Sequence, residues 1–134
     1  MRKPHKRMIG TISPYYWEVD MEKIYNKLVR DNIPDIIRDD NETPVTRILT
    51  NGEYEIELYR KLVEECKEVF EAENDNETCK ELADVLEVIR AIANVKGKSL
   101  EDIIKLANDK RDKRGGFSKR VYLEKSIQKE EIER

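Results

Sequence analysis

No proline and a single glycine, Gly97, occur in the chain between Glu53 and Arg114. Apolar residues recur through this stretch at spacings of three and four, which is the period of an amphipathic helix. The polar run at 74–76 interrupts the pattern, and Ser99 opens a capping-box signature of the kind that begins a helix. We therefore predict three long helices, over residues 53–73, 77–95 and from 99 to the residue before Gly115.

The rest of the chain is predicted to be short or irregular. Pro34 suits a first helical turn, so we expect one short helix within 24–39. Asn51-Gly52 is a turn signal, and brief extended pieces are expected at 45–50 and 120–123. The predicted domains are an N-terminal extension (1–20), one helical domain (21–123) and a charged C-terminal tail (124–134).

The composition favours an all-α bundle that completes its core by oligomerisation. Charged residues make up 41% of the 134 residues and hydrophobic residues 38%, which leaves a modest core with many ion pairs around it. Apolar residues surround most of the predicted helix at 77–95, more than one partner helix covers. We therefore predict that an antiparallel helix hairpin packs against a second subunit.

Charge and cysteine content exclude several functional classes. The net charge of −3 gives no general attraction to nucleic acid, and no apolar stretch is long enough for a transmembrane helix. Two cysteines without C-x-x-C spacing and one histidine make neither a zinc site nor a disulfide framework. We expect a soluble cytoplasmic protein with reduced thiols, in which Cys66 packs and is not a nucleophile.

Four carboxylates are predicted to face the core of the bundle. At about 100° per residue, Glu65 falls inside the apolar sector of its helix and Glu68 lies at the edge of that sector. Glu81 and Asp84 both project within the apolar sector of the next helix. If the helices form a hairpin about 74–76, the pairs Glu68/Glu81 and Glu65/Asp84 lie level with each other.

Carboxylates gathered in a partly apolar setting repel one another and have raised pKa values unless a cation compensates them. Oxygen ligands without histidine or cysteine favour Mg²⁺, with Mn²⁺ as a substitute, over zinc. The alternative is a solvated acidic face with lysine partners one turn away. Glu64 and Glu87 are expected to face solvent in either case.

A second cluster of charge lies downstream, between residues 110 and 120. It contains six basic side chains and one acid, and it straddles Gly115-Gly116, where flexible backbone lets amides and basic groups converge on phosphate oxygens. Basic residues at a helix C-terminus also offset the helix dipole, and a basic patch beside Phe117 and Tyr122 is able to hold RNA. Beside a carboxylate cluster that binds metal, the patch favours a polyphosphate ligand. The basic residues are Lys110, Arg111, Lys113, Arg114, Lys119 and Arg120.

Three ordered motifs resemble those of a known family. KLVEECKE at 61–68 and ELADVL at 81–86 are similar to the ExxE…ExxD signature of the MazG-like all-α nucleoside triphosphate pyrophosphohydrolases. YNKLVRDNIP at 25–34 and NDKRDKRGGF at 108–117 resemble the opening and closing motifs of the phosphoribosyl-ATP pyrophosphohydrolase-like branch. The extension at 1–20 matches nothing in the family pattern.

The resemblance implies a dimeric or tetrameric all-α enzyme that hydrolyses a nucleoside triphosphate to the monophosphate and pyrophosphate. It also implies Mg²⁺ bound by the four motif carboxylates. The predicted metal and catalytic residues are Glu65, Glu68, Glu81 and Asp84. The predicted substrate-binding residues are Asn108, Lys110, Arg111, Arg114, Lys27 and Arg30. For Arg30 an ion pair with Asp31 at a helix start is the other interpretation, and we favour that one.

The leading hypothesis is a Mg²⁺-dependent pyrophosphohydrolase of non-canonical or surplus nucleotides. One alternative is phosphoribosyl-ATP hydrolysis, and another is a non-catalytic helical module that binds nucleotide or RNA. Four negative charges beside the phosphates argue against a pure anion binder. The sequence leaves open the nucleobase, the carboxylate that orients the attacking water, and the choice between dimer and tetramer.

Overall fold

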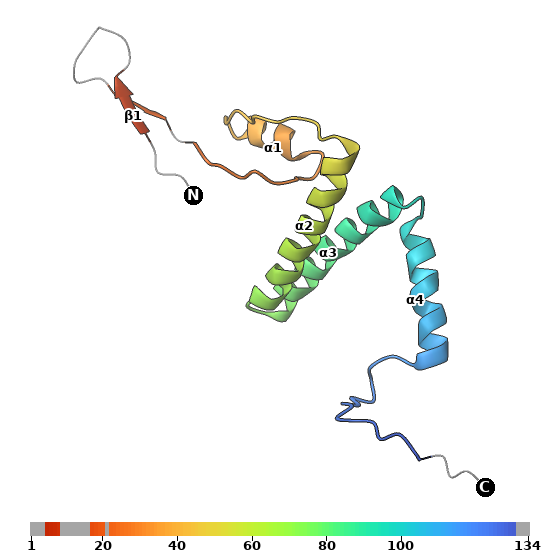
Figure 1. Cartoon of the computed structure of the whole chain (residues 1–134). Coiled ribbons are helices and arrows are strands. Elements are labelled where there is room, and N and C mark those ends of the chain that lie inside the picture. Colours follow the sequence, from red (N-terminus) through yellow and green to blue (C-terminus); the bar gives the residue numbers. More distant parts are fainter. Residues whose placement is uncertain (1–4, 9–16, 21, 131–134) are drawn as a thin grey trace. The chain divides into compact units, whose positions relative to one another are not determined.

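The computed structural model describes residues 5–8, 17–20 and 22–130, and residues 22–130 are helical with irregular connections (Figure 1). The chain forms two compact units, Met1–Val88 and Ile89–Arg134. The elements are β1 (His5–Met8), β2 (Trp17–Asp20), α1 (Ile33–Asp39), α2 (Asn51–Glu71), α3 (Asp75–Val95) and α4 (Leu100–Arg114). The predicted all-α class is thus confirmed for the part of the chain that carries the candidate site.

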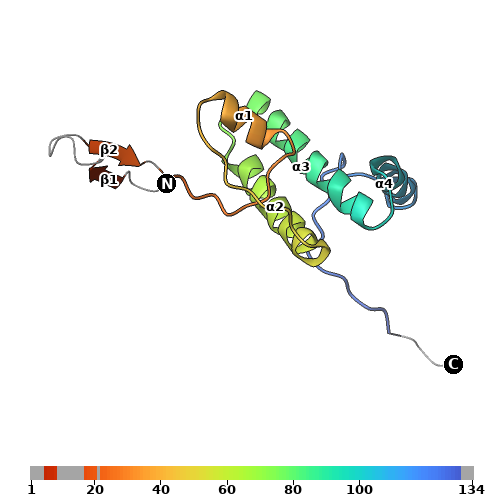
Figure 2. The same cartoon turned by 90° about the horizontal axis from the view of Figure 1, so that it is seen from above.

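The extension contains a two-stranded antiparallel hairpin that the sequence did not predict. β1 and β2 pair with His5 opposite Asp20 and Met8 opposite Trp17 (Figure 2). Each strand has four residues. Alternation over so few residues is too short to distinguish a strand from a loop.

α1 begins as predicted, with Pro34 in its first turn, where a missing N–H costs no intrahelical hydrogen bond. The expected extended pieces at 45–50 and 120–123 are irregular and form no strand within residues 22–130. An extended segment needs a neighbouring strand to satisfy its backbone groups, and neither piece has a ladder partner in that range.

α2 begins at Asn51, so the prediction of a turn at Asn51-Gly52 is wrong. The Glu53 amide donates to Thr50 Oγ1 at 3.3 Å, and the Thr50 amide donates to Glu53 Oε1 at 3.1 Å. This capping box satisfies two amides at the helix start and outweighs the turn preference of Asn-Gly. The Arg47 guanidinium and then the Thr50 groups lower the pKa of Glu53 to about 2, so the capping carboxylate is ionised at neutral pH.

Thr50→Ala is expected to lower the free energy of unfolding by about 1 kcal/mol, because it removes the side-chain acceptor of the cap. Thr46, exposed in the preceding loop, is the matched control, and Thr46→Ala is expected to be nearly silent. Chemical denaturation followed by circular dichroism measures both changes. Equal effects at the two positions would contradict the role of the cap.

A short turn separates α2 from α3. Asn74 Oδ1 accepts from the Glu77 amide at 2.9 Å, and the Asn74 carbonyl oxygen accepts from the Thr78 amide at 2.9 Å. This cap starts α3 at Asp75, two residues before the predicted start at 77. Figure 1 shows α2 and the first part of α3 side by side, on either side of the turn.

Local signals also define the end of α3 and the whole of α4. Gly97, with φ of 72°, ends α3 in a Schellman motif, in which the Lys98 amide donates to the Ala93 carbonyl at 2.9 Å. Ser99 and Asp102 then form the predicted capping box at the start of α4. Gly115 follows the last residue of α4 with φ of 83°, as expected for a helix that stops before the glycine pair.

Few side chains in the described part are buried. They are Leu58, Val88, Ala93 and Leu100. α2 instead exposes an apolar stripe on one face, formed by Ile56, Tyr59, Val63 and Phe70 at spacings of three, four and seven residues. No helix in the described part is both long and apolar enough to cross a bilayer.

Candidate functional site

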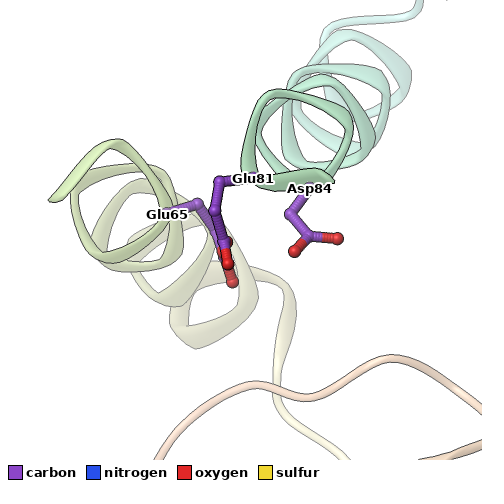
Figure 3. Close-up of side chains that lie close together, drawn as sticks. All are labelled: Glu65, Glu81 and Asp84. Carbon is purple, nitrogen blue, oxygen red and sulfur yellow. The ribbon is translucent and has the colours of Figure 1, made fainter. Parts of the chain in front are cut away.

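Three carboxylates from two helices converge on one side of the α2–α3 pair. Glu65 projects from α2, and Glu81 and Asp84 project from α3 (Figure 3). One carboxylate oxygen of each lies within 4.8 Å of the other two, and all three residues are half-buried. Glu81 and Asp84 share a face because they are three residues apart, and the short turn between the helices brings Glu65 opposite them.

The three side chains form a local excess of negative charge. Burial raises the pKa of Glu81, and the negative charges of Asp84, Glu68 and Glu65 raise it further. A bound cation relieves this repulsion.

The geometry fits a hard divalent cation. Oxygens that share an ion with bonds of about 2.1 Å lie at most about 4.2 Å apart. The separation of up to 4.8 Å in the cluster is therefore close to that of a common coordination sphere. All the donor atoms are carboxylate oxygens, the ligands that Mg²⁺ and Mn²⁺ prefer.

Glu68, the fourth predicted ligand, lies beside this cluster and outside the group of three. Its side chain is exposed, yet its charge contributes to the raised pKa of Glu81. Glu68 and Glu81 also line a common open hollow at the helix turn, with Glu71, Ala72, Glu73, Asn74 and Glu77. The structure therefore brings three of the four predicted carboxylates together and leaves the fourth at the rim.

Glu64 does not face solvent freely, so that prediction is wrong. Its carboxylate accepts from Lys27 Nζ at 3.0 Å and from Lys61 Nζ at 3.4 Å, and its side chain is 33% exposed. Burial alone raises the pKa of Glu64, but the hydrogen bonds and charges of the two lysines outweigh it and lower the pKa. Lys61 also lies 3.6 Å from a carboxylate oxygen of Glu65. Sequence reasoning missed this pairing, for which the 25–34 motif was the available signal.

Arg30 pairs with Asp84, and the favoured interpretation of an Arg30–Asp31 pair at the start of α1 is wrong. Arg30 Nη2 donates to Asp84 Oδ1 at 2.8 Å. Asp84 is half-buried among other carboxylates and offers a stronger negative potential than the exposed Asp31. The segment before α1 runs past the same side of the helices as the three carboxylates, as the orange trace in Figure 3 shows.

The other predicted substrate-binding residues lie on α4, in the second unit. Asn108, Lys110, Arg111 and Arg114 are all exposed there. Lys110 and Arg114 are four residues apart and share a face of the helix. Their placement beside the carboxylates stays a prediction.

The comparison with protein families identifies the region that contains these residues. Residues 54–116 match the model of the MazG nucleotide pyrophosphohydrolase domain. The match covers nearly all of α2 and the whole of α3 and α4, and it includes the four predicted carboxylates. No curated protein and no solved structure matches the chain. The match at residues 54–116 therefore confirms the resemblance to the MazG-like family that the sequence motifs indicate.

Proposed function

We propose that the protein is a Mg²⁺-dependent nucleoside triphosphate pyrophosphohydrolase that acts on a non-canonical or surplus nucleotide. The observation that carries this proposal is the convergence of Glu65, Glu81 and Asp84 inside the segment that matches the MazG domain. Glu68 is proposed as a fourth ligand that reaches the ion from the rim. Bound Mg²⁺ supplies positive charge that offsets the charge on the phosphate oxygens.

The chain's own residues hold the ion, orient the substrate and accept a proton. A carboxylate of the cluster takes a proton from the attacking water as the water oxygen bonds to the α-phosphorus. The bond between the α-phosphorus and the bridging oxygen breaks, and its electron pair leaves with pyrophosphate. The products are the nucleoside monophosphate and pyrophosphate.

One amide side chain and several basic side chains are proposed to bind the triphosphate. They are Asn108 with its neighbours Lys110, Arg111 and Arg114 on α4, together with Lys27 and Arg30 from the segment before α1. The α4 residues lie within the matched segment, and Lys27 and Arg30 contact the carboxylate side of α2 and α3. Guanidinium and ammonium groups bind phosphate oxygens through charge-assisted hydrogen bonds.

Phosphoribosyl-ATP hydrolysis is the second candidate reaction, and the motifs at 25–34 and 108–117 favour it. A non-catalytic nucleotide or RNA binder is less consistent with three converging carboxylates, which repel phosphate unless a cation lies between them. Pyrophosphate release from a nucleotide panel that includes phosphoribosyl-ATP, with Mg²⁺ and with excess chelator, separates these functions. We expect release that depends on Mg²⁺, and absence of release from every substrate would contradict the enzyme proposal.

The protein is proposed to act as a homo-oligomer. The apolar stripe on α2 supports this proposal, because Val63 is 70% exposed and Phe70 is 89% exposed in the single chain. Exposed apolar side chains at a spacing of three and four suit packing against another helix. A second copy of the chain is the partner that we propose.

We expect sedimentation at micromolar concentration to give a dimer or tetramer, and Val63→Glu to shift the protein toward the monomer. A buried carboxylate without a partner is costly, so assembly weakens. Arg38→Glu on α1, outside the apolar stripe and with a side chain 57% exposed, is the control and should leave the assembly intact. A wild-type monomer at this concentration would contradict the oligomer.

A further inference from the structure

The segment before α1 bridges the two helices that carry the carboxylates. It has no regular structure, and its apolar residues Leu28 and Val29 are half-buried. The exposed residues on either side of them reach opposite helices: Lys27 pairs with Glu64 on α2, and Arg30 pairs with Asp84 on α3. Leu28 and Val29 thus anchor a strap whose two cations lie over the carboxylate side.

The two cations of the strap differ in what they contact. Arg30 donates a hydrogen bond to an oxygen of Asp84, which belongs to the group of three carboxylates. Lys27 donates a hydrogen bond to Glu64, which does not belong to that group. Glu64 also accepts from Lys61. Of the two cations of the strap, Arg30 is therefore the one that competes directly with a cation bound by the group of three.

The ion pair between Arg30 and Asp84 is easily replaced by a contact between Asp84 and a metal ion. The Arg30 side chain is 56% exposed and the Asp84 side chain 41%, so water screens the pair and the pair adds little to stability. The lone pairs that accept from the guanidinium are also those that ligate a metal ion. A divalent cation between Glu65, Glu81 and Asp84 brings more charge to Asp84 than one guanidinium does.

A released Arg30 stays beside the same site. Its backbone carbonyl accepts from the Ile33 amide at 3.0 Å, which ties the residue to the start of α1. The planar fork of the guanidinium matches two oxygens of a phosphate group as well as it matches a carboxylate. A phosphate bound at this site would offer the guanidinium acceptor oxygens in place of those of Asp84.

We propose that Arg30 serves as the counter-ion of Asp84 before metal binds, and that it transfers to a substrate phosphate when a divalent cation takes its place on Asp84. This inference rests on the proposed metal centre and adds an order of events to it. Under this proposal Arg30 weakens binding of the divalent cation and strengthens binding of the nucleotide.

The first half of the proposal is that Arg30 is the counter-ion of Asp84 before metal binds. Titration calorimetry of Mn²⁺ binding to the full chain without nucleotide tests it, on wild type, Arg30→Gln and Lys27→Gln. Arg30→Gln is expected to lower the Kd for Mn²⁺ by roughly two- to fivefold, the equivalent of one exposed ion pair. Lys27→Gln removes the same charge from the same segment without freeing a ligand, so its effect is expected to be smaller. Arg30 is exposed, and circular dichroism should show an unchanged helical fold.

Nucleotide binding tests the second half. Arg30→Gln is expected to weaken binding of a nucleotide at saturating Mn²⁺ by roughly tenfold, through loss of a charge-assisted contact, although the same variant binds Mn²⁺ more tightly. An unchanged Kd for Mn²⁺ in Arg30→Gln, or equal changes at Arg30 and Lys27, would overturn the inference and leave the metal centre standing. Absence of Mn²⁺ binding in all three proteins would overturn both proposals.

Discussion

Asp84→Asn and Glu81→Gln are each expected to reduce pyrophosphate release by at least roughly 10³-fold, since a metal ligand supports several kcal/mol of transition-state stabilisation. Each change keeps the shape of the side chain and removes the negative charge that binds the ion. The helical fold should persist. In the absence of metal the stability of Glu81→Gln should stay level or rise, because burial and then the neighbouring negative charges already disfavour the ionised form of Glu81.

Pyrophosphate release and thermal melting, each with Mg²⁺ and with chelator, measure these effects. Glu57→Gln is the matched control, because Glu57 lies on α2 and pairs with Arg60 at 2.9 Å, away from the cluster. Glu68→Gln tests the rim position. A comparable loss of activity would make Glu68 a metal ligand, whereas a mild loss would mean that its charge acts on the site without binding the ion. Full activity in both Asp84→Asn and Glu81→Gln would show that the cluster does not hold the catalytic ion.

Helix boundaries in this chain were predictable wherever a local hydrogen bond sets them. The Ser99 box and the Gly97 stop involve residues within five positions of each other, so the sequence contains the whole interaction. The Thr50 box has the same spacing as the Ser99 box, but Asn51-Gly52 was interpreted as a turn and the signal was passed over. A capping interaction that satisfies two backbone amides outweighs the turn preference of a dipeptide, so the helix begins at Asn51.

The convergence of Glu65, Glu81 and Asp84 was predictable because helical geometry is rigid. A fixed angle and rise per residue place each side chain, and the short turn leaves little freedom between the helices. Glu68 lies one turn further along, where its distance from the others depends on how the helices cross. No residue pattern specifies that crossing.

Helical periodicity could not predict the contacts of the strap. Arg30 and Asp84 are 54 positions apart, and the segment that carries Arg30 is irregular. An irregular segment has no repeat from which a facing residue can be deduced, so local pairing with Asp31 looked simpler. The motif at 25–34 indicated that the segment matters without indicating what it contacts.

Removal of the basic charges on α4 is expected to have the second-largest effect on activity. If Lys110 and Arg114 hold substrate phosphates, Lys110→Ala or Arg114→Ala deletes a contact that strengthens as negative charge moves to the leaving pyrophosphate. We expect kcat/KM to fall by roughly 10²-fold in either variant. Both side chains are exposed at the end of a helix, so their loss leaves no cavity.

The alternative role for these residues predicts a different result. If they only offset the helix dipole, Lys110→Ala should cost about 0.3–1 kcal/mol of unfolding free energy and leave the kinetics nearly unchanged. Lys113 is the internal control, because it is equally exposed in the last turn of α4 but is not among the proposed phosphate-binding residues. A defined phosphate site requires Lys113→Ala to stay close to wild type in pyrophosphate release while Lys110→Ala and Arg114→Ala lose activity. Equal kinetic losses at all three positions would instead mean that α4 attracts the substrate through its summed charge, since a diffuse field does not distinguish neighbouring basic residues.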